Sequence, residues 1–194
     1  MSARDRILAA AERLIGQSGF AATRLSSIAS AAGLGNAGLL HHFPSKAALY
    51  RVVLEDIAAD IHMRIGLEDP SGDAISNLKQ LVEGFLAFHR DRSSAMAIIA
   101  HEFLDQSGRI EEAEVLPLAR VVEDTVAVLE AGQIAGTIRE GDTLAMTAAL
   151  HGALIIGCIG QTVYRRTSGQ SPTEAWEAEL ARSAIASVLL NPDF

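Results

Sequence analysis

The sequence predicts an all-α protein. Its segments are rich in Ala, Leu and Ile, with few β-branched alternations, and their apolar residues recur at helical spacing. Capping residues and glycines divide the 194 residues into about nine helical segments. Hydrophobic residues make up 49% of the chain, enough for a sizeable core. The single cysteine, Cys158, excludes an internal disulfide framework and suits a reducing compartment.

The first predicted helix begins near the N-terminus. Ser2 and Asp5 have the spacing of a capping box, with Asp in place of the usual Glu. The apolar residues that follow at helical intervals are Ile7, Leu8, Ala11, Leu14 and Ile15. Glu12 and Arg13 interrupt this apolar stretch, so the segment does not have the pattern of a signal peptide.

Residues 23–46 have the pattern of a helix-turn-helix, TRLSSIASAAGLGNAGLLHHFPSK. We predict a helix from about Ser26 to Ala32 and a second from Asn36 to His42. Gly33 follows the first as a residue able to adopt a left-handed backbone. Ser45 can cap the next helix, which places Lys46 at a helix N-terminus, where N–H groups and an ammonium suit a phosphate.

Several short motifs in this region carry a resemblance to a known family. They are RILAAA at 6–11, GFAAT at 19–23, IA at 28–29, AGL at 32–34 and HHFPSK at 41–46, with Leu49 behind them. On these motifs, residues 4–50 resemble the N-terminal domain of the tetracycline-repressor (TetR-type) family of bacterial one-component transcription regulators. The resemblance implies a helix-turn-helix DNA-binding domain over residues 1–48. It also implies a larger helical effector-binding and dimerisation domain over residues 49–194.

We expect the DNA-binding residues to lie on the helix-turn-helix and at the start of the next helix. They are Thr23, Arg24, Ser26, Ser27, Asn36, Ala37, Gly38, Leu40, His41, His42 and Lys46. Four positions depart from the family's usual residues: Gly35 and Arg24 replace capping Ser or Thr, Gly38 replaces Thr or Ser, and Leu40 replaces Tyr. An interior Gly costs a helix about 1 kcal/mol relative to Ala, so we expect a loosened recognition helix.

The charge distribution agrees with this prediction. Residues 1–51 contain six basic and two acidic side chains, a net charge of +4, whereas the whole chain carries −8. The remainder therefore carries −12. A basic end on an acidic body would attract DNA to that end only.

The rest of the chain is predicted to be helical. The expected helices are about Lys46–Ile65, Asp73–Arg90, Ser94–Asp105, Ile110–Ile134 with Pro117, Asp142–Arg166, and one from the capping box at Ser171–Glu174 to Leu190. Residues 143–164 carry no charge, and 22 residues would be long enough to cross a bilayer. His151, Gln161, threonines and glycines within the segment favour instead the central helix of a soluble protein.

In the family, the last two long helices pair with those of a second copy. Small residues at helical spacing allow the close approach that such pairing needs, although they can equally pack inside one subunit. The predicted dimer-interface residues are Ala153, Gly157, Gly160, Trp176, Leu180, Ala184 and Ser187.

The family also encloses a small effector among its middle helices. The candidate lining residues here are Phe85, Phe88, His89, Met96, Ile99, Phe103, Met146, His151 and Ile155. Each can also be an ordinary core residue. His151 is singled out because a buried imidazole on an apolar helix needs a polar partner, which can be a side chain, a water or a ligand. The low charge predicts a mainly apolar effector.

Other chemistries find little support. His101 and Asp105 have metal-ligand spacing, but a closed zinc site needs four ligands and a catalytic one three. Neither a G-x-S-x-G motif, a P-loop nor a dinucleotide fingerprint occurs. We therefore predict no enzyme activity, no metal and no cofactor. The predicted function is a cytoplasmic repressor that binds a palindromic double-stranded DNA operator as a homodimer, does not enter membranes, and is released by the effector.

Overall fold

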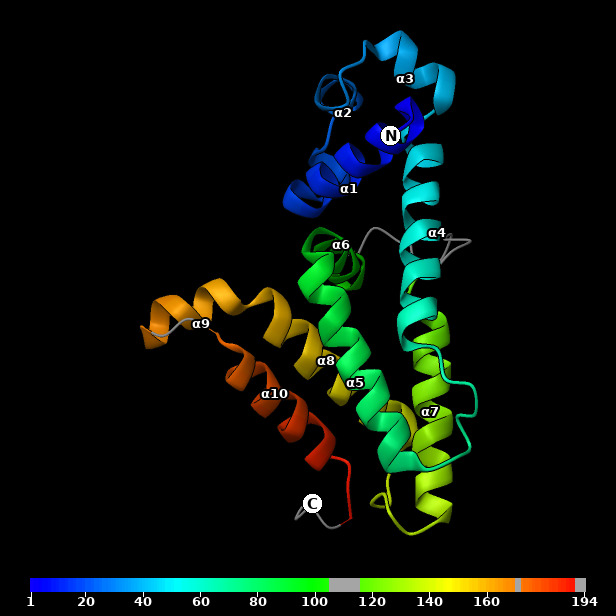
Figure 1. Ribbon diagram of the computed structural model, residues 1–194, viewed down its shortest axis with the longest axis vertical. Helices are drawn as coiled ribbons and strands as arrows, with labels where there is room; N and C mark the ends of the chain where they lie inside the picture. The colour runs from blue at the N-terminus through cyan, green and yellow to red at the C-terminus, as the bar shows by residue number, and fades with distance from the viewer. Residues whose placement is uncertain (105–115, 170–171, 191–194) are drawn as a thin grey trace. The chain divides into compact units, whose positions relative to one another are not determined.

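The computed structural model describes residues 1–104, 116–169 and 172–190, and confirms the predicted all-α class (Figure 1). Within these ranges the only β-structure is an isolated antiparallel bridge between Ile138 and Leu189. The helices are α1 (Ala3–Ala22), α2 (Leu25–Ala31), α3 (Asn36–His42), α4 (Lys46–Ile65), α5 (Ala74–Asp91), α6 (Ser93–Leu104), α7 (Ala119–Ile134), α8 (Thr143–Ile159), α9 (Gln161–Ser168) and α10 (Glu174–Ala186).

The helices belong to two compact units. The first, called here the head unit, comprises Met1–Asp60 and Arg92–Pro117. The second, called the body unit, comprises Ile61–Asp91 and Leu118–Phe194. Helix α4 runs continuously through the boundary between the units. Helix α6 lies in the head unit although α5, of the body unit, precedes it in the chain.

The head unit is built on α1. The predicted capping box is present, with the Asp5 N–H donating to the Ser2 hydroxyl at 3.1 Å and the Ser2 N–H to Asp5 Oδ2 at 2.8 Å. These hydrogen bonds lower the pKa of Asp5. The apolar face of α1 packs against α2 and α6, and α2 packs against α3. Residues with no more than 1% exposure fill the centre: Ile7, Ala11, Ile15, Ile28, Ala29, Leu39 and Leu49.

Helices α1 and α6 approach each other closely at Gly16. A Cβ atom added at Gly16 would lie 2.5 Å from the carbonyl oxygen of Ser94 and 3.1 Å from its Cα. Three residues further on, Gly19 has φ +77° and kinks the end of α1. The imidazole of His101 lies beside this kink, with Nε2 3.3 Å from the Gly16 carbonyl oxygen. Glycine at position 16 is thus what lets the two helix backbones meet.

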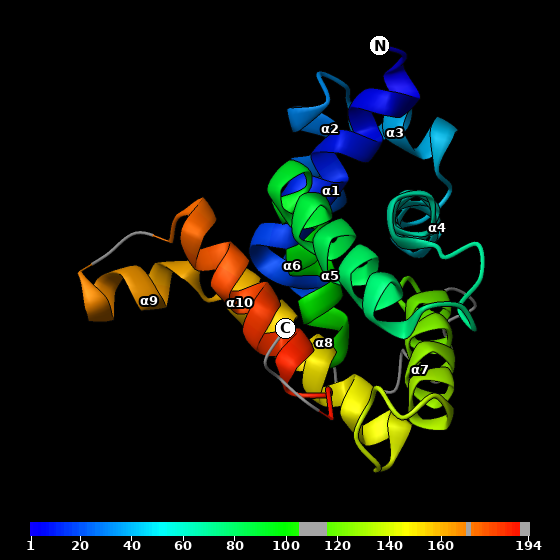
Figure 2. The same ribbon diagram turned by 60° about the horizontal axis from the view of Figure 1, so that its bottom comes forward.

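The body unit packs α5 against α7, α8 and α10, and α8 against α7 and α10. Helices α8 and α10 lie side by side in both views (Figures 1 and 2). Gly157 faces α10 within the same chain, because a Cβ there would lie 2.4 Å from a methyl group of Leu180. The core of this unit includes Leu78, Val82, Phe85, Phe88 and Leu150.

Several predicted helix boundaries were wrong. Within the described residues, α7 begins at Ala119, after Pro117, and α10 ends at Ala186 instead of Leu190. The helix expected over Asp142–Arg166 breaks at Gly160, and α8 and α9 meet there at a bend of 67°. A side chain at Gly160 would collide with the Ile156 carbonyl oxygen, at 2.6 Å. The last helix begins at Glu174, because Thr173 caps it by accepting the Trp176 N–H at 3.3 Å. Ser171 of the predicted capping box lies outside the described residues.

The uncharged segment 143–164, whose length would suit a membrane span, is divided between α8 and α9. Among the described helices, none is by itself both long enough and apolar enough to cross a bilayer. Only α8 and α9 taken together meet the criteria, by length and composition, and the bend divides them.

The contact at Gly16 leads to a prediction about stability. We expect Gly16→Ala to lower the free energy of unfolding by roughly 1–3 kcal/mol, because the added methyl group overpacks a backbone-to-backbone contact. Gly38→Ala is the matched control, since a Cβ there meets only Leu34 side-chain atoms, at an ordinary 3.8 Å. It should raise stability by about 0.5–1 kcal/mol. Urea unfolding of both variants checks this, and a neutral Gly16→Ala would contradict it.

Candidate functional site

The turn between α2 and α3 has the geometry of a helix-turn-helix. Gly33 adopts φ +72°, as predicted for the residue that ends α2. The Leu34 N–H then donates back to the Ala29 carbonyl at 2.9 Å, and the Gly33 N–H donates to Ser30 at 3.0 Å. These bonds satisfy carbonyl groups at the end of α2 and fix the direction in which α3 leaves the turn.

Helix α3 has the predicted bounds and presents one face to solvent. Leu39 is fully buried and Phe43, which follows the helix, is nearly so. The exposed members of the predicted DNA-binding set on this helix are Asn36, Ala37, Leu40, His41 and His42. Gly38 is half-buried, and Leu40 leaves 45% of its surface exposed. The face available for contact therefore contains an amide and two imidazoles but no formally charged side chain.

The N-terminal ends of α2 and α3 lack the side-chain caps that the start of α4 has. Neither Arg24 before α2 nor Gly35 before α3 makes a side-chain cap hydrogen bond. Ser45 does cap α4 as predicted, accepting the Ala48 N–H at 3.0 Å. Arg6 of α1 donates from Nε to the Ala32 carbonyl at 3.1 Å, which places a cation at the C-terminal end of α2.

Thr23 is placed differently from the rest of the predicted set. It is 6% exposed, and its hydroxyl donates to the Gly19 carbonyl at 2.8 Å and lies 3.3 Å from the Leu14 carbonyl oxygen. Its side chain therefore supports the kinked end of α1, and we leave it out of the surface set. Arg24, Ser26 and Ser27 are exposed.

Lys46 lies at the start of α4, as predicted, and its ammonium reaches α1. Nζ is 3.3 Å from the Ala21 carbonyl oxygen and 4.3 Å from the centre of the Phe20 ring. The ring of Tyr50 in turn lies 4.5 Å from that of Phe20. A cation near the last carbonyl groups of a helix and over an aromatic ring stabilises that helix end. Lys46 thus joins α4 to α1 besides standing at a helix N-terminus.

A second group of polar residues is buried in the body unit around His151. His151 is 6% exposed, its Nε2 lies 3.1 Å from the Thr125 hydroxyl, and its ring stacks on Phe85 at 6.4 Å. The Thr125 hydroxyl donates its own proton to the Val121 carbonyl at 2.7 Å. It therefore accepts from the imidazole, which places the ring proton on Nε2. Burial lowers the pKa of His151 to about 4, so the ring is neutral at pH 7.

Two further polar atoms lie near the same helices. Among the described residues, the Thr147 hydroxyl and His89 Nδ1 are buried without a hydrogen-bond partner. Burial also lowers the pKa of His89 and raises that of the Cys158 thiol to about 12. The sequence analysis missed Thr125 and Thr147, because threonine on an apolar helix is common and gives no distinctive pattern.

The predicted effector residues are divided between the two units. Phe85, Phe88, Met146, His151 and Ile155 are buried in the body unit, and His89 there is half-buried. Met96 and Ile99 are buried in the head unit, on α6, where Phe103 is 60% exposed. His101, weighed for metal binding, contacts the Gly16 carbonyl instead, and Asp105 lies outside the described residues.

The predicted dimer residues fall into two groups. Ala153 on α8 and Ser187 after α10 are exposed. Gly157 and Ala184 are buried, and Leu180, which contacts Gly157, is half-buried, as are Trp176 and Gly160. Other α8 residues that the sequence analysis did not select are exposed and apolar: Leu144, Ala145, Ala148, Ala149, Ile156 and Ile159.

Comparisons with known proteins agree with the geometry of the head unit. Residues 7–53 match the family described as bacterial regulatory proteins, tetR family. Over 51 residues the chain is 51% identical to the transcriptional regulator RutR of Escherichia coli K12, a match covering 26% of this chain and 24% of RutR. Over 111 residues it is 32% identical to the nucleoid occlusion factor SlmA of Aliivibrio fischeri, covering 55% and 56%. The chain thus spans only about a quarter and about half of these relatives.

A solved structure matches the fold over nearly the whole chain. The hemolysin II transcriptional regulator HlyIIR superposes with a TM-score of 0.77 and 17% identity, covering 96% of each chain. At that identity the likeness concerns the fold alone.

The buried imidazole leads to a prediction about pH. In the unfolded chain a histidine titrates near pH 6.5, so the unfolded state binds a proton at a higher pH than the folded state. The stability contributed by neutral His151 is present above that pH and falls below it, by at most about 1.4 kcal/mol per pH unit. We expect His151→Asn to reduce this pH dependence in urea unfolding between pH 7.5 and 5.

His62→Asn, on the exposed side of α4, is the matched control for the loss of an imidazole. A residual dependence in His151→Asn is expected from His89, whose pKa is also lowered. Identical pH profiles for wild type and His151→Asn would contradict the assignment of the buried proton site.

Proposed function

Because the chain is a member of the tetR family of bacterial regulatory proteins, we propose that it is a cytoplasmic repressor. In this proposal two copies bind a palindromic operator, and a small, mainly apolar effector releases them. The observation that carries the proposal is the exposed face of α3, with Asn36, His41 and His42, on a basic N-terminal segment of an acidic chain.

The exposed face divides by chemistry into groups that read bases and groups that hold phosphates. Asn36 lies in the first turn of α3, and an amide can pair bidentately with adenine in the major groove. Arg24 is exposed at the start of α2 and suits a phosphate. Lys46 contributes to the phosphate contact at the start of α4 while it also holds α1.

The second copy is expected to cover the exposed apolar face of α8. The residues listed above lie along one side of this helix, and Ile156 leaves 55% of its surface exposed. No charged residue occurs between Asp142 and Arg165, so this face can be buried without stranding an unpaired charge. A contiguous apolar surface of this kind marks an interaction site, and a half-site reader needs a second copy.

The effector is expected in the body unit, near His151. The neutral imidazole, the neutral thiol of Cys158 and the Thr147 hydroxyl, for which the described residues supply no partner, give this interior uncharged groups that can form hydrogen bonds. The buried carboxylate of Asp124 on α7 pairs with Arg120 at 3.0 Å. Because His151 already pairs with Thr125, the ligand role requires that an effector share or replace this bond. A His151→Leu variant that keeps DNA binding and still responds normally to the effector would remove His151 from the site.

We expect the wild-type protein to shift its own upstream DNA at a lower concentration than a scrambled duplex of equal length. Arg24→Gln should weaken binding to both duplexes by the same factor, because one phosphate contact is lost. For the same reason it should reduce the slope of log affinity against log salt concentration by about one. Asn36→Ala should instead reduce the difference in binding free energy between the upstream and the scrambled duplex, by about 1–3 kcal/mol if a bidentate pair with adenine is lost. Lys79→Gln, at an exposed position of α5, is the control that removes the same charge elsewhere in the chain. Equal wild-type affinity for both duplexes would refute the proposal.

The dimer is tested on the outer face of α8. We expect Ile156→Arg to give a monomer with reduced operator affinity, because a charge would be buried in the dimer interface. Met63→Arg, at an exposed position of α4, is the control for the same kind of change. Gly157→Arg is unsuitable, because its side chain would collide with Leu180 of the same chain. Light scattering at micromolar concentration gives the mass, and a monomeric wild type would refute the dimer.

A further inference from the structure

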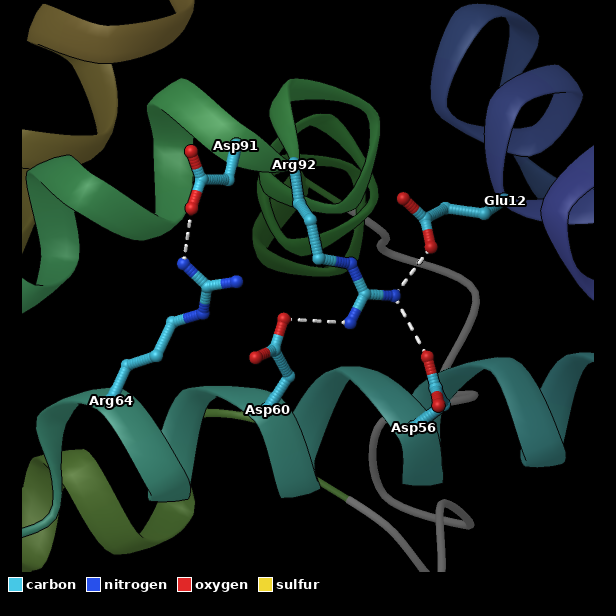
Figure 3. A network of polar contacts seen from close by, with 6 residues as sticks. All are labelled: Glu12, Asp56, Asp60, Arg64, Asp91 and Arg92. Atoms are coloured by element: carbon cyan, nitrogen blue, oxygen red, sulfur yellow. Dashed lines mark hydrogen bonds and ion pairs between the residues drawn. The ribbon is translucent and has the colours of Figure 1, made fainter.

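The N-terminal end of α6 is tied to two other helices of the head unit by one arginine. Arg92 immediately precedes α6, and its guanidinium meets Glu12 of α1, Asp56 of α4 at 2.8 Å and Asp60 of α4 at 2.9 Å (Figure 3). The nitrogen that meets Glu12 also meets Asp56, and the other terminal nitrogen meets Asp60. One planar group thus fixes α1 and α4 relative to the start of α6.

Packing alone does not join α1 and α4 at this point. A cavity of about 240 Å³ lies between them, lined by Leu8, Ala9 and Val53 and by the carboxylates of Asp5, Glu12 and Asp56. The side chains of Arg92, Glu12 and Asp60 are each no more than 20% exposed, so these two ion pairs are weakly screened by solvent, whereas Asp56 is 60% exposed. Burial alone would lower the pKa of Arg92, but hydrogen bonds to Glu12 and Asp60 outweigh it and raise the pKa.

The other end of α6 is tied to the head unit by Glu102. The Tyr50 hydroxyl donates to Glu102 Oε1 at 2.5 Å, and Tyr50 is almost fully buried. The Tyr50 ring packs at a tilt of 33° against Phe20, and the Lys46 ammonium at the start of α4 lies over the Phe20 ring. A continuous line of contacts therefore runs from the end of α6 to the helix that directly follows the helix-turn-helix.

From these contacts we propose that Arg92 is a positioning residue for DNA recognition, because its guanidinium holds α1 and α4 at the start of α6. This inference rests on the proposed DNA-binding function. Arg92 touches no DNA in this proposal. It acts through α1 and α4, which flank α2 and α3 in the chain, and so sets the orientation in which the exposed face of α3 meets a half-site.

A lysine cannot replace this arginine. Its single ammonium lacks the planar fork that serves carboxylates from two helices at once. Removing the cation entirely would take away the guanidinium that Glu12, Asp56 and Asp60 share, which destabilises the fold for reasons unrelated to position. The test must therefore separate loss of stability from loss of orientation.

Three full-length variants make this separation. Arg92→Lys keeps the charge and removes the fork. Arg92→Met combined with Glu12→Gln and Asp60→Asn removes the ion pairs together with most of the repulsion, a change that often leaves stability intact. Arg90→Gln is the control, because Arg90 lies two residues away and pairs with Glu177 of the body unit, at 2.9 Å.

Each variant is assayed by thermal unfolding, by gel shift with upstream and scrambled DNA, and by amide hydrogen exchange of α3 and the start of α4. For Arg92→Lys and for the neutralised triple variant we expect affinity for upstream DNA to fall about tenfold, the scale of a coupling effect. Affinity for scrambled DNA should be unchanged, and exchange in α3 should be faster. The triple variant should unfold near the wild-type temperature, and Arg90→Gln should resemble wild type throughout.

Recovery of both the unfolding temperature and the upstream-DNA affinity in the triple variant would overturn the proposal, since Arg92 would then serve stability alone. Wild-type affinity in Arg92→Lys would overturn it as well. Equal binding of upstream and scrambled DNA by the wild type would instead refute the proposed function. In that case the positioning role of Arg92 is tested by amide hydrogen exchange alone. An exchange rate in α3 of Arg92→Lys equal to that of the wild type would refute this role.

Discussion

The head unit depends on the close approach of α1 and α6 at Gly16. Two helix backbones meet there without a side chain between them, so the position of α6 is coupled directly to that of α1. His101, Glu102 and Arg92 then add polar attachments at both ends of α6. Dense packing transmits a displacement instead of absorbing it, because there is little free volume into which side chains can move. A shift of α6 would therefore move α1.

In the proposed function, this arrangement gives an effector signal two routes to the helix-turn-helix. Helix α4 runs continuously through both units and offers one covalent route. Helix α6 offers a second, because it follows α5 of the body unit directly and packs within the head unit. An effector alters DNA affinity only to the extent that it binds one arrangement of these helices more tightly than another. The route through α4 and the route through α6 meet where Arg92 joins α1, α4 and α6. Together they restrict the possible arrangements of these helices more than either route alone.

The body unit buries a satisfied imidazole and a paired carboxylate. Burial keeps His151 and the Cys158 thiol neutral, so neither group incurs the cost of desolvating an ion. The buried carboxylate of Asp124 is paired with Arg120. Threonines on α7 and α8 provide hydroxyl groups within this unit, and one of these has a protein partner while the other lacks one in the described residues. On its outer side, α8 shows an apolar face that is exposed in the described part of the chain.

Local signals in the sequence determined the helical class, the turn at Gly33, the caps at Ser2 and Ser45, and the bounds of α3 and α4, because each depends on residues only a few positions apart. The tertiary structure alone decided the contacts that join distant segments. It placed α6 in the head unit, turned Gly157 toward Leu180, and gathered Glu12, Asp56 and Asp60 around Arg92. No periodicity or spacing reports such contacts, because they form only when helices far apart in the chain pack together.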